Sequence, residues 1–114
     1  MYSGATTAGR VRSDGFACDL HADGRERILG IAEGRLDADA AVALGEGVLH
    51  AARATCELVV LDLRQVDRVA PEAVGVILDM RRRLLRAGTE LVVTPGAAVR
   101  AAIAWQDASL LETA

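Results

Sequence analysis

The sequence contains few aromatic residues, and all of its basic residues are arginines. Aromatic residues make up 3% of the 114-residue chain, so a hydrophobic core must be built from Val, Ile, Leu and Ala. Hydrophobic residues make up 52% of the chain, which is enough for such a core without disulfide bonds. The length predicts a single domain.

Cysteine and histidine are scarce as well. The two cysteines, Cys18 and Cys56, lack the close spacing of a zinc-binding pair, so we expect both to be free, buried thiols. His21 and His50 fall on different predicted elements, without a matching pattern of cysteine or carboxylate residues. Neither a metal site nor a cofactor is therefore expected.

Long hydrophobic runs are also absent. No segment is apolar over the length that a membrane-spanning helix needs, so we expect no membrane insertion. The N-terminal residues lack the apolar segment of a signal peptide, and we therefore expect a cytoplasmic protein. Residues 1–14 are small and polar, which predicts a disordered leader in front of a single domain at residues 15–114.

The sequence lacks a motif for catalysis or for phosphate binding. Without lysine, a G-x-x-x-x-G-K-[ST] phosphate-binding loop is excluded. The net charge of −3 argues against a nucleic-acid partner, because nucleic-acid binding needs a cationic surface. We find no group of residues typical of a catalytic site, and the chain is not expected to be an enzyme.

The most informative stretch runs from Leu58 to Gly88. It begins with LVVLDL, an apolar run typical of a strand buried on both faces. The next residues, 64–70, are predicted to form a loop. Pro71 suits the first position of a helix, because its missing N–H would have no partner there. The apolar residues that follow recur every three or four positions, which predicts an amphipathic helix that ends before Gly88.

The remaining sequence predicts further strands and helices in alternation. Asp23 and Gly24 suit a tight turn between two strands, and Asp37 suits the N-cap of a helix. The resulting order, β-β-α-β-α-β-α, favours an α/β fold with a four-stranded mixed sheet. The predicted elements are strands at 16–21, 27–33, 58–63 and 91–94, and helices at 38–54, 71–87 and 97–105.

The first predicted helix is rich in alanine and contains Gly45 and Gly47, each of which weakens a helix by roughly 1 kcal/mol relative to Ala. We expect close packing against the sheet to explain both glycines. The apolar stripe that would face the sheet comprises Val42, Leu44, Val48, Leu49 and Ala52.

The second predicted helix carries four arginines near its end, at positions 81, 82, 83 and 86. Cations in the last turns of a helix interact favourably with its negative end, which is a sufficient structural explanation. A salt-sensitive contact with an acidic partner protein is the functional alternative. A nucleic-acid patch is less favoured, because no aromatic residues accompany the arginines.

Three segments resemble the STAS domain, the module of bacterial anti-sigma factor antagonists and of sulphate transporter tails. Residues 33–44 are similar to the family's Gly-x-Leu-Asp loop that opens the first helix. Residues 58–78 are similar to its strand, Asp-Leu, loop and helix start, and residues 85–94 to its Gly-x-x-Leu strand. The resemblance implies a STAS-like fold and a non-enzymatic module for sigma factor and transcription regulation.

The resemblance also implies a partner and a binding surface. The partner would be an anti-sigma factor of the histidine-kinase-like ATPase type or a related regulatory protein, and a homodimer is compatible with it. The candidate partner-binding residues come from the loop before the first helix and from the start of the second: Gly34, Leu36, Asp37, Arg68, Ala70, Pro71, Glu72, Ala73 and Val74.

The chain departs from the family at the start of the second helix. The family has Asp-Ser-Ser-Gly there, and a partner kinase phosphorylates the second Ser. This chain has Ala70, Pro71, Glu72 and Ala73, so Glu72 occupies the phosphoacceptor position and offers no hydroxyl. Glu72 is either a fixed mimic of the phosphorylated state or an ordinary acidic residue of a helix start.

Two other functions stay open at this point. STAS-like proteins also serve as accessory subunits of lipid-transport ABC systems and as structural parts of stress-sensing complexes, neither of which needs a hydroxyl at residue 72. Binding of a small molecule or nucleotide is a weaker alternative.

Overall fold

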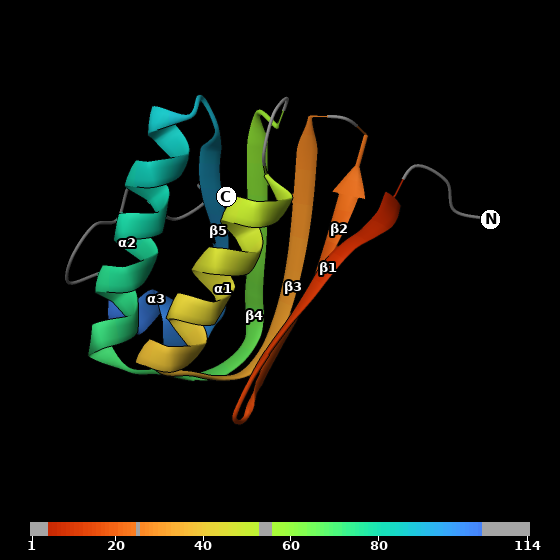
Figure 1. Ribbon diagram of the computed structural model, residues 1–114. Coiled ribbons are helices and arrows are strands. Elements are labelled where there is room, and N and C mark those ends of the chain that lie inside the picture. The colour runs from red at the N-terminus through yellow and green to blue at the C-terminus, as the bar shows by residue number, and fades with distance from the viewer. Residues whose placement is uncertain (1–4, 25, 53–55, 104–114) are drawn as a thin grey trace.

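The computed structural model describes residues 5–24, 26–52 and 56–103. It shows an α/β fold in which helices pack on a single sheet (Figure 1). The elements, in chain order, are β1 (Ala5–Ser13), β2 (Phe16–Asp23), β3 (Arg27–Leu36), α1 (Ala38–Ala51), β4 (Leu58–Val69), α2 (Pro71–Arg86), β5 (Glu90–Pro95) and α3 (Ala97–Ile103).

The five strands form one mixed sheet in the order β1-β2-β3-β4-β5. β1, β2 and β3 pair antiparallel, whereas β3, β4 and β5 pair parallel. Parallel neighbours need a crossover connection, and α1 and α2 supply the two crossovers on the same face of the sheet (Figure 1). α3 follows β5 and packs against β4. The predicted α/β fold is confirmed, with five strands in place of four.

The fifth strand lies where a disordered leader was predicted. Residues 5–13 form β1, which pairs with β2 from Ala5↔Asp23 to Ser13↔Phe16, so that part of the leader prediction was wrong. Val11 faces the core and is buried, while Arg10 and Arg12 are exposed. The segment has only one large apolar side chain, so it depends on main-chain hydrogen bonds to β2. The composition of the segment does not indicate this pairing. Residues 1–4 of the predicted leader lie outside the described residues.

The predicted loop at residues 64–70 is also largely strand. β4 continues to Val69 and pairs there with the end of β3, although the register shifts twice along the way. In this half of β4 only Val66 is fully buried, and the other side chains are polar or partly exposed. The polar composition reflects an exposed strand end and not a loop. The helix predicted at 38–54 ends earlier, at Ala51, and residues 104–105 of the last predicted helix lie outside the described residues.

The hydrophobic core lies between the sheet and α1 and α2. It is built from aliphatic side chains, as the scarcity of aromatic residues requires, and its largest fully buried members are Leu20, Leu36, Leu44, Leu61, Leu63, Ile77 and Leu84. Gly47 of α1 has the packing reason that the sequence predicts, because a Cβ atom there would collide with Cγ2 of Val11 on β1. Gly45 has no such reason: its Cβ would meet only the Met80 Cβ, at 3.9 Å, which is ordinary contact.

Candidate partner-binding site

The starts of α1 and α2 lie next to each other because β3 and β4 end side by side. Leu36 and Val69 are register partners, and the Ala70 N–H donates a hydrogen bond of 3.0 Å to the Leu36 carbonyl oxygen. Each strand leads directly into its helix, so both helices begin at the same edge of the sheet, where the parallel strands end (Figure 1). This edge contains all the residues predicted for partner binding.

The start of α1 is closed by its own N-cap. Asp37 has an extended backbone, and its carboxylate Oδ1 accepts a hydrogen bond from the Ala40 N–H at 2.8 Å. The predicted N-cap is confirmed. Because this bond occupies a carboxylate oxygen, Asp37 acts first as a structural residue of α1.

The start of α2 is arranged differently. Ala70 occupies the N-cap position with an extended backbone but has no side chain that can accept a hydrogen bond, and Pro71 follows in the first turn. Glu72 is exposed in that turn and is its only acidic residue. The positive end of the helix dipole favours an anion at this place by about 0.3–1 kcal/mol. Glu72 therefore presents a negative charge to solvent at an N-terminus that no side chain caps.

The other candidate residues fall into two groups, those with buried side chains and those with accessible ones. Leu36, Ala73 and Val74 are fully buried in the core, so their side chains support the site and are not available to a partner. The candidate residues at the start of α2 that are exposed or half-buried are Arg68, Ala70, Pro71 and Glu72, and we call this group the α2 tip.

Gly34 has a structural reason that explains its presence. Its φ of +98° lies in the region that side chains rarely adopt, and a Cβ there would collide with the Gly15 carbonyl oxygen. The same oxygen accepts a hydrogen bond from the Arg35 N–H at 2.7 Å. Gly34 therefore lets the β1–β2 turn pack on β3, which is sufficient to explain a glycine without any partner.

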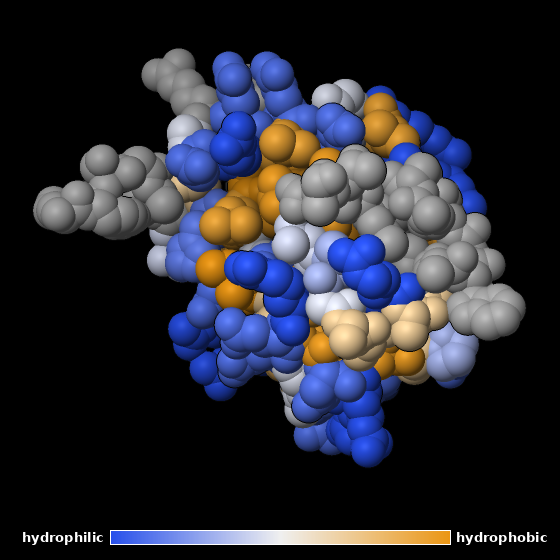
Figure 2. All heavy atoms as spheres, turned by 180° about the vertical axis from the view of Figure 1, so that it is seen from behind, coloured by the Kyte–Doolittle hydropathy of each residue, from blue (hydrophilic) through white to orange (hydrophobic). Residues whose placement is uncertain are grey.

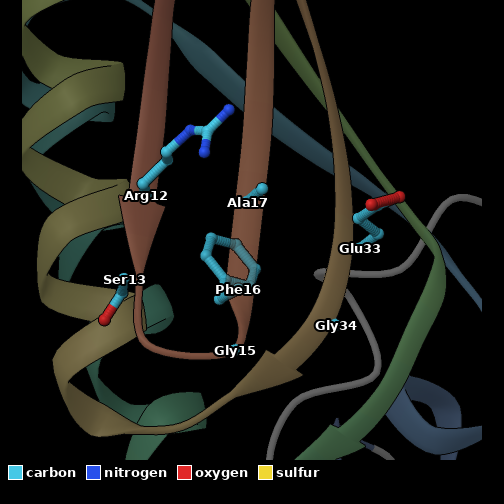
Figure 3. A pocket seen from close by; sticks show the side chains of 7 residues that line it. All are labelled: Arg12, Ser13, Gly15, Phe16, Ala17, Glu33 and Gly34. Atoms are coloured by element: carbon cyan, nitrogen blue, oxygen red, sulfur yellow. The ribbon is translucent and has the colours of Figure 1, made fainter.

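A shallow hollow of about 260 Å³ lies beside this turn (Figure 3). It is lined by residues of β1, β2 and β3, and its charged groups are Arg12 and Glu33. The hydroxyl of Ser13 lines it as well. Among the described residues, no three metal-ligating side chains come together, and no helix there is long and apolar enough to cross a membrane.

The two cysteines are free and buried, as predicted. Burial and, to a smaller extent, the neighbouring Asp19 carboxylate together raise the pKa of the Cys18 thiol to about 12. The pKa of Cys56 is also raised by burial. Both side chains therefore stay protonated at neutral pH, and neither is suited to act as a nucleophile.

Asp62, which ends the LVVLDL run, is held by Arg64 on the same strand. The guanidinium Nε and Nη2 lie 2.9 and 2.8 Å from the two carboxylate oxygens, and the Arg64 N–H donates a third bond at 3.1 Å. These hydrogen bonds, the side-chain ones first, hold the pKa of Asp62 below its usual range. The carboxylate is fully engaged in the middle of β4, apart from the α2 tip.

The sheet face that α1 and α2 leave uncovered carries apolar residues, which gather between hydrophilic ones (Figure 2). Leu29, Val60 and Val92 form one row across β3, β4 and β5, and each is only partly buried. Ile31, two residues beyond Leu29, is 39% exposed. This face is a second candidate surface for another protein.

Two large apolar residues of the helices are exposed, although Val42 belongs to the stripe predicted to face the sheet and Leu85 follows the apolar spacing of the second helix. Val42 of α1 is 48% exposed and Leu85 of α2 is 50% exposed. Hydrophobic spacing alone does not fix how far a helix is rotated on the sheet, so residues at the margin of a stripe are easily misplaced. Gly75 of α2 is exposed as well, and a Cβ there would touch nothing within 4 Å.

Comparison with known proteins defines the class of this protein. The family model described as "Mlab, STAS domain" matches residues 18–109, which is most of the chain. The chain therefore belongs to this STAS domain family, as the sequence resemblance implied. No curated protein matches its sequence.

Solved structures agree on the fold. The anti-sigma factor antagonist SpoIIAA in its unphosphorylated form superposes with a TM-score of 0.71 at 18% identity, over 85% of this chain and 87% of that one. The crystal structure of Mglu matches with a TM-score of 0.63 at 22% identity, over 87% of this chain but only 23% of Mglu. This protein thus has the fold of an anti-sigma factor antagonist.

Proposed function

We propose that this protein is a non-enzymatic regulatory module that binds a partner protein through the α2 tip. The observation that carries the proposal is the exposed carboxylate of Glu72 at a helix N-terminus without a side-chain cap. The fold similarity to SpoIIAA supports an anti-sigma factor of the histidine-kinase-like ATPase type as the partner. The two free thiols agree with a reducing compartment such as the cytoplasm, where we propose that it acts.

The same proposal assigns a specific role to Glu72. In the family resemblance, residue 72 stands where relatives carry a Ser that is phosphorylated. A phosphoserine brings about −1.5 to −2 charges to a helix start, whereas a glutamate brings −1. Glu72 would thus hold the surface permanently in a state that relatives reach only after phosphorylation. The partner would then recognise a fixed negative charge.

Phosphate mapping tests this role. The chain is incubated with labelled ATP and the histidine-kinase-like protein that co-purifies with it, and the products are mapped by mass spectrometry. We expect no phosphate within residues 70–73 of the natural chain. Glu72→Ser restores a hydroxyl at the helix start and serves as the positive control. A phosphate on residues 70–73 of the natural chain would overturn the assignment.

A second candidate function is supported by the other face of the sheet. The apolar row of Leu29, Val60 and Val92 gives the domain a second surface, which suits an accessory subunit held between two proteins of a larger assembly. Co-purification from native cells separates the two functions. A single small kinase-like partner favours sigma factor control, whereas a stable particle containing a transport ATPase or many subunits favours the accessory role.

A further inference from the structure

A groove lies between α1 and α2. The groove has a volume of about 150 Å³, and its apolar wall comprises Val42 and Leu49 from α1 and Val76 and Met80 from α2. Both helices run in the same direction from the same edge of the sheet (Figure 1). Val42 and Val76 lie in the N-terminal halves of their helices, so the apolar wall begins within about one turn of the α2 tip.

Gly45 of α1 leaves the groove open at a cost to helix stability. Glycine weakens a helix relative to alanine, and Gly47 is explained by its contact with Val11. Gly45 lines the groove and would accept a Cβ at ordinary contact distance from Met80. Gly75 lies on the same side of α2 as Glu72 and Asp79, and a Cβ there would touch nothing. Neither Gly45 nor Gly75 is required by the packing of this fold.

The charged residues around the groove indicate which kind of partner segment would fit it. Glu46 of α1 and Asp79 of α2 line it from the two sides, and Asp79 is paired with Arg83 at 3.0 Å. Asp39 and Glu72 lie about two helical turns earlier on the same helices, and both are exposed. The charged residues in the N-terminal halves of the two helices, Asp39 and Glu72, are therefore both acidic, which complements a partner segment that places a basic residue next to an apolar one.

We propose that the groove binds an apolar anchor side chain of the partner, with an arginine or lysine within one turn of it that faces Glu46 or Glu72. The inference rests on the proposed function, because it extends the α2 tip into a larger binding surface for the same partner. The anchor would pack between Val42 and Val76, above Gly45. Such a site makes recognition depend on shape and apolar contact as well as on the charge of Glu72.

Site-specific cross-linking in native cells tests the proposal. The photoreactive residue benzoylphenylalanine is introduced at Arg68 in the α2 tip, at Val42 in the groove and, as a control, at Leu85 outside it. We expect positions 68 and 42 to label the same protein and position 85 to leave it unlabelled. The peptide labelled from position 42 should contain an apolar residue within four positions of Arg or Lys.

The outcomes separate this inference from the proposed function. Two results would contradict partner binding in the groove and leave the proposed binding at the α2 tip unaffected. One is labelling from position 68 without labelling from position 42, and the other is a labelled peptide without a basic residue. Labelling from position 42 alone supports partner binding in the groove and contradicts partner binding at the α2 tip. No labelling from either position contradicts both.

Affinity measurements with the labelled partner give the quantitative test. We expect Val42→Ser to weaken binding at least tenfold and Leu85→Ser, at a residue of matched exposure, to change it by less than twofold. Gly45→Ala narrows the groove without disturbing the fold, so it should weaken binding at least threefold while its melting temperature rises. Unchanged affinity for both Val42→Ser and Gly45→Ala would overturn the proposal.

Discussion

The Ala70 N–H and the Leu36 carbonyl oxygen form a hydrogen bond of 3.0 Å that joins the end of β4 to the end of β3. Because the bond uses only main-chain atoms, the side chain of Ala70 takes no part in placing the α2 tip. The bond also brings the capped start of α1 beside the start of α2, which lacks a side-chain cap. The starts of α1 and α2 therefore lie side by side.

This difference in capping predicts opposite effects of two substitutions. Asp37→Ala removes the bond to the Ala40 N–H and should lower the free energy of unfolding by about 1 kcal/mol. Ala70→Ser supplies the missing cap at an extended residue and should raise the free energy of unfolding by about 0.5–1 kcal/mol. Urea denaturation measures both values. A loss of stability on Ala70→Ser would show that the start of α2 is not arranged as described.

The two central glycines of α1 form a matched pair. Gly47→Ala forces a Cβ against Val11 and should lower the free energy of unfolding by roughly 1–3 kcal/mol, as overpacking does. Gly45→Ala meets no close atom and should raise the free energy of unfolding by about 0.5–1 kcal/mol, because alanine favours the helix. Thermal unfolding monitored by circular dichroism compares them. Equal effects of the two substitutions would disprove the close packing of α1 on β1.

A second pair of glycines tests the β1–β2 turn. Gly34→Ala places a side chain at a φ of +98° and against the Gly15 carbonyl, and should destabilise the fold by roughly 1–3 kcal/mol. Gly75→Ala, on an open helical surface, should stabilise it by about 0.5–1 kcal/mol. Chemical denaturation of both variants gives the comparison. If Gly34→Ala were neutral, the turn would not pack on β3.

Asp62 makes a predictable contribution to stability in acid. Its pKa is lowered in the folded state by Arg64, so the folded chain binds its proton less readily than the unfolded chain, whose pKa is near the ordinary 3.8. The stabilisation is therefore present above that value and is lost as the pH falls through the lower pKa of the folded state. Asp62→Asn removes this dependence. Its stability should fall less steeply than that of the natural chain below pH 3.8, as followed by denaturation at a series of pH values.

The sequence predicts most of the fold because several signals are local. The LVVLDL run, the Asp23–Gly24 turn, the Asp37 cap and the position of Pro71 each depend on neighbouring residues only, and each marks its element correctly. The expected burial of LVVLDL on both faces was wrong, because every second side chain of this run is only partly buried. β1 was missed because its stability comes from pairing with β2, which lies next to it in space but is not visible in the composition of residues 5–13.

The candidate site was less predictable from the sequence, because it depends on how the helices pack on the sheet and on each other. Leu36, Ala73 and Val74 belong to the motif by position, but the packing of the two helices on the sheet buries their side chains. Conversely, Val42 belongs to an apolar pattern and yet is exposed at the groove. The roles of Gly34, Gly45 and Gly47 also required the structure, since only the distance to a neighbouring chain segment distinguishes a glycine that packing demands from one that it does not.

The most direct test of the central claim is the affinity of the partner for the natural chain and for Glu72→Gln, which keeps the shape of the side chain and removes its charge. Glu57→Gln, at another exposed glutamate, is the matched control. If the partner recognises a fixed negative charge at the start of α2, Glu72→Gln should weaken binding at least fivefold, with a smaller effect at high salt, while Glu57→Gln changes it less than twofold. Equal or tighter binding by Glu72→Gln would contradict the claim.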